Sequence, residues 1–229
     1  MSFKTAILTA LIALAAGFAG SGLWSMAGLD NGQTRAFLME NPDILPEMAE
    51  AWQKQEAAAR LSEAADGVDE PFPGAVIGNP EGSKVLVEFS DYGCTYCRSS
   101  LADVEALVAA DPEVKVVVRE WAIFDGSEEA ARMALAAARQ GKYAQFHKAM
   151  FDMGPPSEAS IERAARSAGL DYERALADAA SPEIAAEIVF NRELARSIGF
   201  TGTPSWVANG QVLEGAVGRE RLADALEEG

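Results

Sequence analysis

Residues 85–97 read Val85-Leu-Val-Glu-Phe-Ser-Asp-Tyr-Gly-Cys-Thr-Tyr-Cys97. The apolar first part of this stretch, residues 85–89, is typical of a buried strand. Apolar residues at helical spacing over 101–108 predict a helix directly after the two cysteines. Cys94 therefore lies where a strand gives way to a helix, and Cys97 lies one helical turn further along the chain.

The position of Cys94 at the start of a helix suits thiol chemistry. Free backbone N–H groups and the helix dipole stabilise an anion there, and the thiolate is the reactive form of cysteine. We therefore expect Cys94 to be the exposed, attacking thiol. We expect Cys97, which is within reach one turn later, to resolve the mixed disulfide that the attack produces.

The chain has only these two cysteines. Disulfides that stabilise exported proteins usually join distant cysteines, whereas this pair is only three residues apart. A zinc site needs about four ligands, and the chain adds one histidine, His147, which we expect to be packed in a helix rather than catalytic. Haem attachment needs a histidine where Arg98 stands. The pattern therefore favours redox chemistry, with a copper(I) site on the two thiolates as an alternative.

The pattern beyond the cysteines predicts an α/β fold. Residues 114–119 are rich in β-branched valine and are expected to form the second strand of a β-α-β unit, whose two strands are parallel. Helical patterns then fill 127–198, with Ser127 as the expected cap of the first helix. A β-hairpin follows around Asn209-Gly210, and a helix over 219–226 comes last. We expect a central sheet with helices on both faces and a helical domain inserted between its strands.

Residues 1–29 are expected to be a signal peptide or a membrane anchor. Lys4 is followed by an apolar stretch, and no charged residue appears again before Asp30. Because Lys4 should stay on the cytoplasmic side of the membrane, we expect the rest of the chain to be exported.

Residues 30–66 form a polar, helix-prone arm. Leu45, Met48 and Trp52 fall on one helical face of this arm. That face would either pack on the main domain or associate copies of the chain. Glycines and prolines over 67–80 indicate a linker after the arm.

The main domain is expected over 81–229, and the chain as a whole is acidic. It has 19 basic and 35 acidic residues and a formal net charge of −16. A chain with this charge does not attract nucleic acid or anionic lipid. We interpret the charge as an aid to solubility and expect no nucleic-acid partner.

Two segments resemble the DsbA-like thiol-disulfide oxidoreductases, which are thioredoxin-fold proteins with an inserted helical domain. Phe89-Ser-Asp-Tyr-Gly-Cys-Thr-Tyr-Cys97 is similar to their active site, and Gly202-Thr-Pro-Ser-Trp-Val207 is similar to their cis-proline loop. The separation of about 105 residues between the two segments fits the helical insertion. The resemblance covers roughly residues 85–226 and implies a thioredoxin-like central sheet.

The resemblance assigns further residues to the site. It implies that Thr203 and Pro204 lie beside the dithiol, where Thr203 offers its backbone to a substrate peptide as an added strand. It implies that Glu88 helps to move the proton of the resolving thiol; the alternative is that Glu88 faces solvent at the sheet edge. Thr95 and Tyr96 stand where strongly oxidising members have Pro-His, so we expect a milder oxidant. Neither a cofactor nor a metal is implied.

Residues 30–66, with Glu40-Asn-Pro-Asp-Ile-Leu45 ahead of a polar helix, resemble the N-terminal arm of the copper-sensitivity-suppressor C branch of this family. In that branch the arm implies oligomerisation and disulfide isomerase or reductase activity. The sequence thus predicts an oxidoreductase of the periplasm or cell envelope, with exported proteins as substrates, a membrane redox partner and self-association into a homo-oligomer. The direction of exchange, oxidase or isomerase, stays open. The alternative function is a copper-handling or chaperone-like binding protein that uses the thiols as ligands.

Overall fold

The structure is a computed structural model, which describes residues 7, 12–14, 17, 29–64 and 67–227. The chain divides into two compact units, Met1–Gln53 and Lys54–Gly229. The signal peptide or membrane anchor expected over 1–29 lies for the most part outside the described residues. Among the residues that are described, we find no helix with the length and apolar character needed to cross a membrane.

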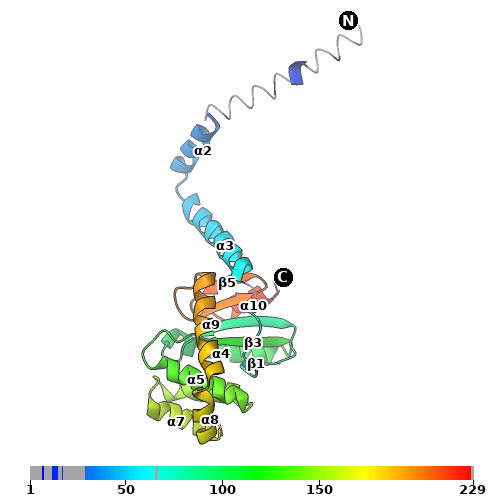
Figure 1. Cartoon of the computed structure of the whole chain (residues 1–229). Coiled ribbons are helices and arrows are strands. Elements are labelled where there is room, and N and C mark those ends of the chain that lie inside the picture. Colours follow the sequence, from blue (N-terminus) through cyan, green and yellow to red (C-terminus); the bar gives the residue numbers. More distant parts are fainter. Residues whose placement is uncertain (1–6, 8–11, 15–16, 18–28, 65–66, 228–229) are drawn as a thin grey trace. The chain divides into compact units, whose positions relative to one another are not determined.

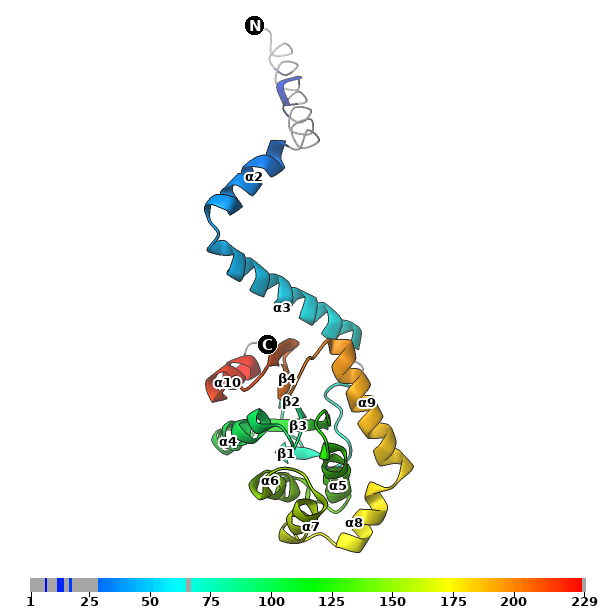
Figure 2. The ribbon, with the colours of Figure 1, turned by 90° about the vertical axis from the view of Figure 1, so that its left-hand side faces the viewer.

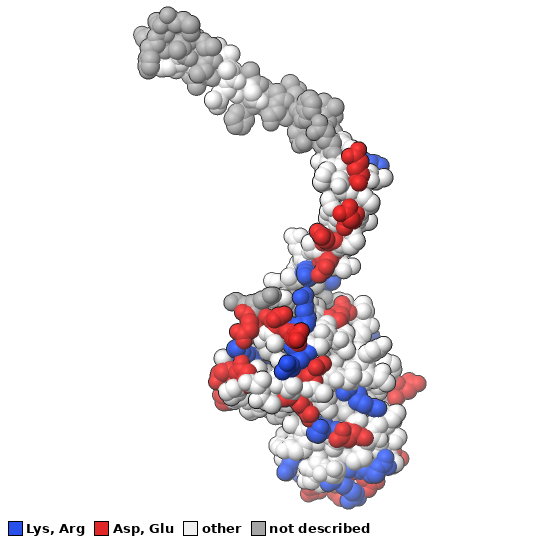
Figure 3. Space-filling view, turned by 180° about the vertical axis from the view of Figure 1, so that it is seen from behind, with Lys and Arg blue, Asp and Glu red and all other residues white. Residues whose placement is uncertain are grey.

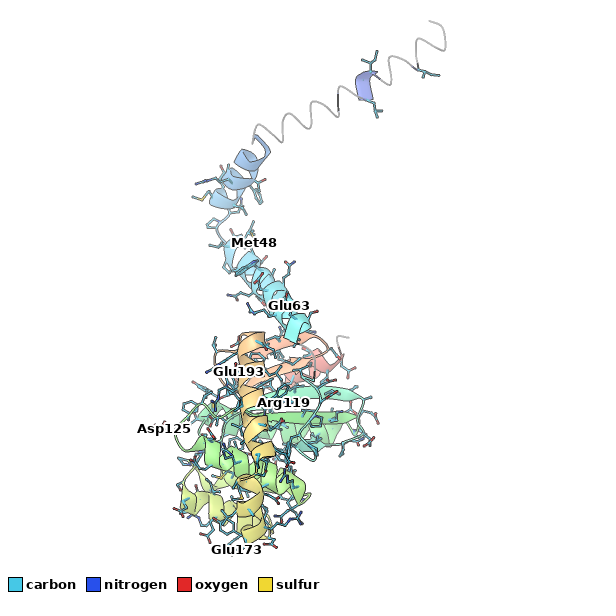
Figure 4. All side chains as sticks on the ribbon, viewed as in Figure 1. Met48, Glu63, Arg119, Asp125, Glu173 and Glu193 are labelled. Atoms are coloured by element: carbon cyan, nitrogen blue, oxygen red, sulfur yellow. The ribbon has the colours of Figure 1, made fainter. Side chains whose placement is uncertain are left out.

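The first unit contains α2 (Leu29–Glu40) and the start of α3 (Ile44–Ala64). Asn41 lies between these helices, and its side-chain amide donates a hydrogen bond to the Phe37 carbonyl at 2.8 Å. The three apolar residues of the arm are 68%, 47% and 63% exposed, namely Leu45, Met48 (labelled in Figure 4) and Trp52. The apolar face predicted for the arm is therefore uncovered.

The second unit is built on a five-stranded sheet (Figure 1). Its strands are β1 (Val76–Gly78), β2 (Lys84–Ser90), β3 (Val114–Glu120), β4 (Ser205–Ala208) and β5 (Gln211–Glu214). Their order is β1-β3-β2-β4-β5, in which β2 and β3 are parallel and the other pairs are antiparallel. The parallel pair at the centre is the predicted β-α-β unit, because the crossover helix joins β2 to β3.

Seven helices of this unit accompany the described strands. They are α4 (Thr95–Ala110), α5 (Ser127–Arg139), α6 (Tyr143–Met153), α7 (Glu158–Ser167), α8 (Tyr172–Ala179), α9 (Pro182–Ile198) and α10 (Arg219–Glu227). Helices α5 to α9 all lie between β3 and β4 in the chain, where the helical insertion was expected. The predicted α/β fold is confirmed. The expected cap at Ser127 is wrong, because Gly126, with a φ of 78°, precedes the helix and Ser127 is its first residue.

The sheet separates two apolar cores. One core, on the face that α4 and α10 cover, includes Leu86 and Val116, and the other, on the face that α9 covers, includes Val87 and Phe89. Figure 2 shows α4 and α10 on one side of the strands and α9 on the other. Because side chains alternate along a strand, Glu88 and Leu86 point toward α4 while Val87 and Phe89 point toward α9.

Buried Arg119 fixes the residues that precede the sheet. It lies in β3 beside α9 (labelled in Figure 4) and is 1% exposed. Its guanidinium donates to three backbone carbonyls, those of Gly67, Val68 and Glu70. Later in the same segment, β1 pairs with β3. The linker expected over 67–80 is therefore shorter than the sequence indicated, because a three-residue strand is too short to show an alternating pattern.

Charged side chains are scattered over the visible face of the Lys54–Gly229 unit in Figure 3. On the face seen in Figure 3, acidic and basic side chains lie interspersed over the unit.

Candidate active site

Cys94 is the N-cap residue of α4. Its φ and ψ of −82° and 120° are extended, and its sulfur accepts a hydrogen bond from the Cys97 backbone N–H at 3.4 Å. The strand-to-helix elbow predicted from the sequence thus places the Cys94 Sγ at the positive end of a helix. This position stabilises a thiolate through a backbone donor and the helix dipole.

The two thiols are free, and both are buried. Cys94 is 4% exposed and Cys97 is 1% exposed. The expectation that Cys94 is exposed is therefore wrong. The cause is a contact that local sequence cannot show, since the Cys94 thiol donates to the Thr203 carbonyl at 3.2 Å across a separation of 109 residues.

Thr203 and Pro204 form the loop that covers the dithiol. The peptide bond between them is cis, as the family resemblance implied. Pro204 is buried, and its carbonyl accepts a hydrogen bond from the Gly215 N–H at 2.8 Å, which connects the loop to the end of β5. The structure thus brings Cys94, Cys97 and Thr203 together.

Glu88 is buried within β2, where it is 2% exposed. It lies in register with Val118 of β3 and Trp206 of β4, so it has a strand on each side. The alternative of a solvent-facing edge position is wrong. Burial raises the pKa of Glu88 to about 7, because a carboxylate in this environment has lost its water.

The pKa of the resolving thiol is also perturbed. Burial raises the pKa of Cys97 well above its usual range, and the charge of Glu88 raises it further. The Asp91 backbone opposes this rise through a hydrogen bond. Glu88 is therefore close enough to Cys97 for the two groups to affect each other's ionisation.

A second buried carboxyl, Glu120, ends β3 on the same face of the sheet. Tyr92 and Tyr143 both donate to its Oε1 atom, at 2.9 and 2.6 Å, and the Tyr92 hydroxyl also lies 3.0 Å from His147 Nδ1. Burial raises the pKa of Glu120 to about 8 and lowers that of His147 to about 3. His147 is thus a neutral, packed residue, as the sequence indicated. The network itself was not predicted.

Asp91 is a further residue at this site that the sequence did not indicate. It follows β2, is 2% exposed, and accepts four hydrogen bonds through its carboxylate. One local signal exists, because an aspartate often accepts from the N–H two residues later, here that of Gly93. The other three donors come from residues at least 32 positions away, and no local pattern indicates them.

The described residues contain no group of three or more His, Cys, Asp or Glu side chains that could hold a metal ion. Within the described part of the chain, a metal would have to rely on the two thiols as its cysteine ligands. Copper(I) is the metal that two thiolates suit.

Residues 85–227 match the family model described as the DSBA-like thioredoxin domain. This match spans more than half of the chain, from the first central strand to the last helix. The chain belongs to the DsbA-like thioredoxin family. A second family model, the copper resistance protein ScsC N-terminal domain, matches residues 34–59 of the arm.

Solved structures of DsbA-like and ScsC proteins are similar to this chain. A thioredoxin-like oxidoreductase from Silicibacter pomeroyi DSS-3 is 44% identical, with 71% of this chain and 95% of that chain covered at a TM-score of 0.67. A linker-deletion mutant of Proteus mirabilis ScsC is 25% identical, with 85% and 90% covered at a TM-score of 0.70. The predicted resemblance to the DsbA-like family and its ScsC branch is confirmed.

Curated relatives match over a smaller share of their own length. The Na(+)/H(+) antiporter NhaA of Herminiimonas arsenicoxydans is 29% identical over 160 residues, which are 66% of this chain and 25% of that protein. The chain spans about a quarter of the length of the curated relatives it matches. Their name, antiporter, therefore describes proteins of which about three quarters lie outside the matched region.

Proposed function

We propose that this DsbA-like protein exchanges disulfides with exported proteins through Cys94 and Cys97. The observation that carries the proposal is the environment of the Cys94 sulfur. It lies 3.4 Å from the Cys97 N–H at a helix start and 3.2 Å from the Thr203 carbonyl. The first contact stabilises the attacking thiolate. The second places the Thr203-Pro204 loop, which would bind a substrate peptide as an added strand, beside that thiolate.

The exchange has two steps in the reducing direction. The Cys94 thiolate attacks one sulfur of a substrate disulfide, the S–S bond breaks, and the other substrate sulfur leaves as a thiolate that takes a proton. The Cys97 thiolate then attacks Cys94 Sγ in the mixed disulfide. This attack forms the Cys94–Cys97 disulfide and releases the second substrate thiolate, so that two electrons pass to the substrate. The oxidising direction reverses both steps.

Glu88 supplies the proton acceptor that Cys97 needs. A buried thiol with a raised pKa ionises only when a neighbouring base takes its proton. Glu88 has a pKa of about 7, so near neutral pH it is present both as an acid and as a base. This balance suits a group that accepts a proton in one direction of exchange and returns it in the other.

The location and partners follow from the N-terminal sequence. Lys4 and the apolar stretch after it favour export, so the substrates are exported polypeptides with thiols or disulfides. A membrane redox partner would restore the dithiol or the disulfide after each turnover. The exposed face of Leu45, Met48 and Trp52 would associate copies of the chain, which favours isomerase work because several dithiols then act on one substrate.

Trapping of mixed disulfides tests the assignment of the two thiols. Cys97→Ser should accumulate mixed disulfides with exported proteins, because attack by Cys94 continues and release fails. Cys94→Ser, the matched control, should accumulate none. If alkylation shows that Cys97 reacts faster than Cys94, the two roles are exchanged and the assignment fails.

A reduction potential, measured against glutathione buffers, decides the direction of exchange. A value near that of thioredoxin indicates a reductase, and a markedly higher value indicates an oxidase. Copper handling is the second candidate, because the arm matches the N-terminal domain of a copper resistance protein. Retention of one copper(I) ion per dithiol, without turnover of a disulfide substrate, would replace the redox proposal by this one.

A further inference from the structure

The carboxylate of Asp91 connects three segments that are distant in the sequence. Its Oδ1 atom accepts from the Gly93 N–H at 2.6 Å and from the Ser127 hydroxyl at 2.5 Å. Its Oδ2 atom accepts from the N–H groups of Ile123 and Phe124 at 2.6 and 3.0 Å. A buried carboxylate is costly unless donors replace its water, and here four donors do so.

These hydrogen bonds bring the 122–124 segment against the residue that precedes Cys94. A Cβ atom at Gly93 would lie 2.8 Å from the Phe124 Cβ and 2.8 Å from the Ser127 Oγ, closer than real Cβ atoms approach. Only a glycine therefore fits there. Phe124 thus packs closely against Gly93, the residue before Cys94, and the Asp91 side chain holds the 122–124 segment there.

The 122–124 segment is apolar and uncovered. Ile123 is 43% and Phe124 is 49% exposed, whereas the thiol they accompany is 4% exposed. Tyr96, in the first turn of α4, is 66% exposed. Single exposed apolar side chains are ordinary. These three, however, lie on segments next to Cys94, whose sulfur a substrate must reach. A polypeptide brings apolar side chains to that contact, and a small disulfide brings none.

We infer that Asp91 is a positioning residue, which holds Ile123 and Phe124 beside Cys94 and thereby makes the protein prefer disulfides in polypeptides over small disulfides. The inference rests on the proposed thiol-disulfide exchange and names a determinant of its substrate choice. Asp91 does not touch the substrate itself. It acts through the backbone N–H groups of the 122–124 segment.

The test measures single-turnover oxidation of the reduced full-length protein by two disulfides, scrambled ribonuclease A and oxidised glutathione. Asp91→Asn keeps the side-chain shape but replaces one acceptor oxygen by an NH₂ group. The two donors that bonded to that oxygen therefore lose their hydrogen bonds. We expect the rate constant with the polypeptide to fall about tenfold, as for one or two lost apolar contacts. The rate constant with glutathione should change by less than about twofold.

A double-mutant cycle separates positioning from a direct effect. Ile123→Ser with Phe124→Ser should reproduce the selective loss, and adding Asp91→Asn to that variant should cost less than about another twofold. Asp125→Asn is the matched control, because it removes the same charge from an exposed neighbour at the periphery of the unit (Figure 4) and should leave both rates unchanged.

Two outcomes overturn the inference. If Asp91→Asn slows both disulfides equally, Asp91 acts on the thiols; if its effect adds fully to that of the Ile123 and Phe124 variant, it does not act through them. Should Asp91→Asn fail to fold, Ser127→Ala, which removes one of the four donors, takes its place in the cycle. A wild-type protein that reduces neither disulfide contradicts the proposed function instead.

Discussion

Both faces of the central sheet bury polar groups, but they differ in how those groups are paired. On the face toward α9, the Arg119 guanidinium donates to three backbone carbonyls and also to Glu187 and Asn191. On the side of α4 and the dithiol, two buried side-chain oxygens lack a hydrogen-bond partner among the described residues, namely Ser100 Oγ and Glu120 Oε2.

This difference assigns separate tasks to the two faces. An unpaired buried polar group costs free energy, and proteins retain that cost mainly where function requires it. The α9 face, with its apolar core and its fully paired arginine, contributes stability. The α4 face contributes less stability, because it buries ionisable groups near the thiols. The following experiments change the α9 face first, then the α4 face, and last the arm outside the sheet.

The largest effect is expected from the apolar core of the α9 face. Phe89→Ala removes a ring that packs against Trp121 and Phe200, and it should lower the free energy of unfolding by about 3–5 kcal/mol. The thiol reactivity of the molecules that remain folded should not change. Denaturant unfolding and thiol alkylation measure the two quantities. Val212→Ala, at a partly buried position of the same core, should cost less.

The next effect is a dependence of stability on pH that comes from the α4 face. The pKa of Glu88 rises from 4.5 to about 7 on folding, so between these values the folded state holds a proton that the unfolded state has lost. Stability therefore falls as the pH rises through this window, and above pH 7 the loss reaches about 3 kcal/mol, since each pKa unit is worth about 1.4 kcal/mol.

Denaturant unfolding of Glu88→Gln at two pH values checks this sign. The variant should be more stable than the wild type at pH 8 and similar to it below pH 5. Glu120, whose pKa is about 8, should leave part of the pH dependence in place. Exposed Glu81 provides the control, and Glu81→Gln should follow the wild type at both pH values. A variant that is less stable at pH 8 would show that the Glu88 charge is paired.

The same substitution should slow resolution. Without a proton acceptor near Cys97, Glu88→Gln should lower the rate of the second exchange step by ~10²-fold, and the attack by Cys94 should stay nearly intact. Rapid quenching at several pH values separates the two steps. If the second step keeps its rate at every pH, Glu88 has a structural role only.

The smallest effect on the dithiol is expected from removal of the arm. A chain that begins at Lys54 keeps Leu61 and Val68, which are buried in the core of the α9 face, whereas a chain that begins at Pro71 would lose both. We expect the shortened chain to be a monomer, to keep its alkylation rate within about twofold and to lose isomerisation of a scrambled substrate. Light scattering that finds the intact chain monomeric would contradict self-association through Leu45, Met48 and Trp52.

Local sequence patterns predicted the parts of this protein that depend on neighbours in the chain. The elbow at Cys94, the hairpin turn at Asn209 and the helical insertion all follow from spacing and turn residues. The hydrogen bonds of Asp91 could not be predicted, because three of its four donors lie 32 to 36 residues away. The burial of Cys94 likewise depends on a carbonyl 109 residues distant. What the sequence missed is long-range pairing of buried polar groups.

The hydrogen bond from the Cys94 thiol to the Thr203 carbonyl has a consequence for the chemical lifetime of that thiol. An open thiolate is carried by peroxide from sulfenic to sulfinic acid, and the second product is not recovered by ordinary thiols. A sulfur that is 4% exposed and covered by a backbone carbonyl offers little surface to a dissolved oxidant. A substrate that docks along that loop can still bring its own sulfur to Cys94. The Thr203 carbonyl therefore hinders access of dissolved oxidants to Cys94 more than it hinders access of a docked substrate.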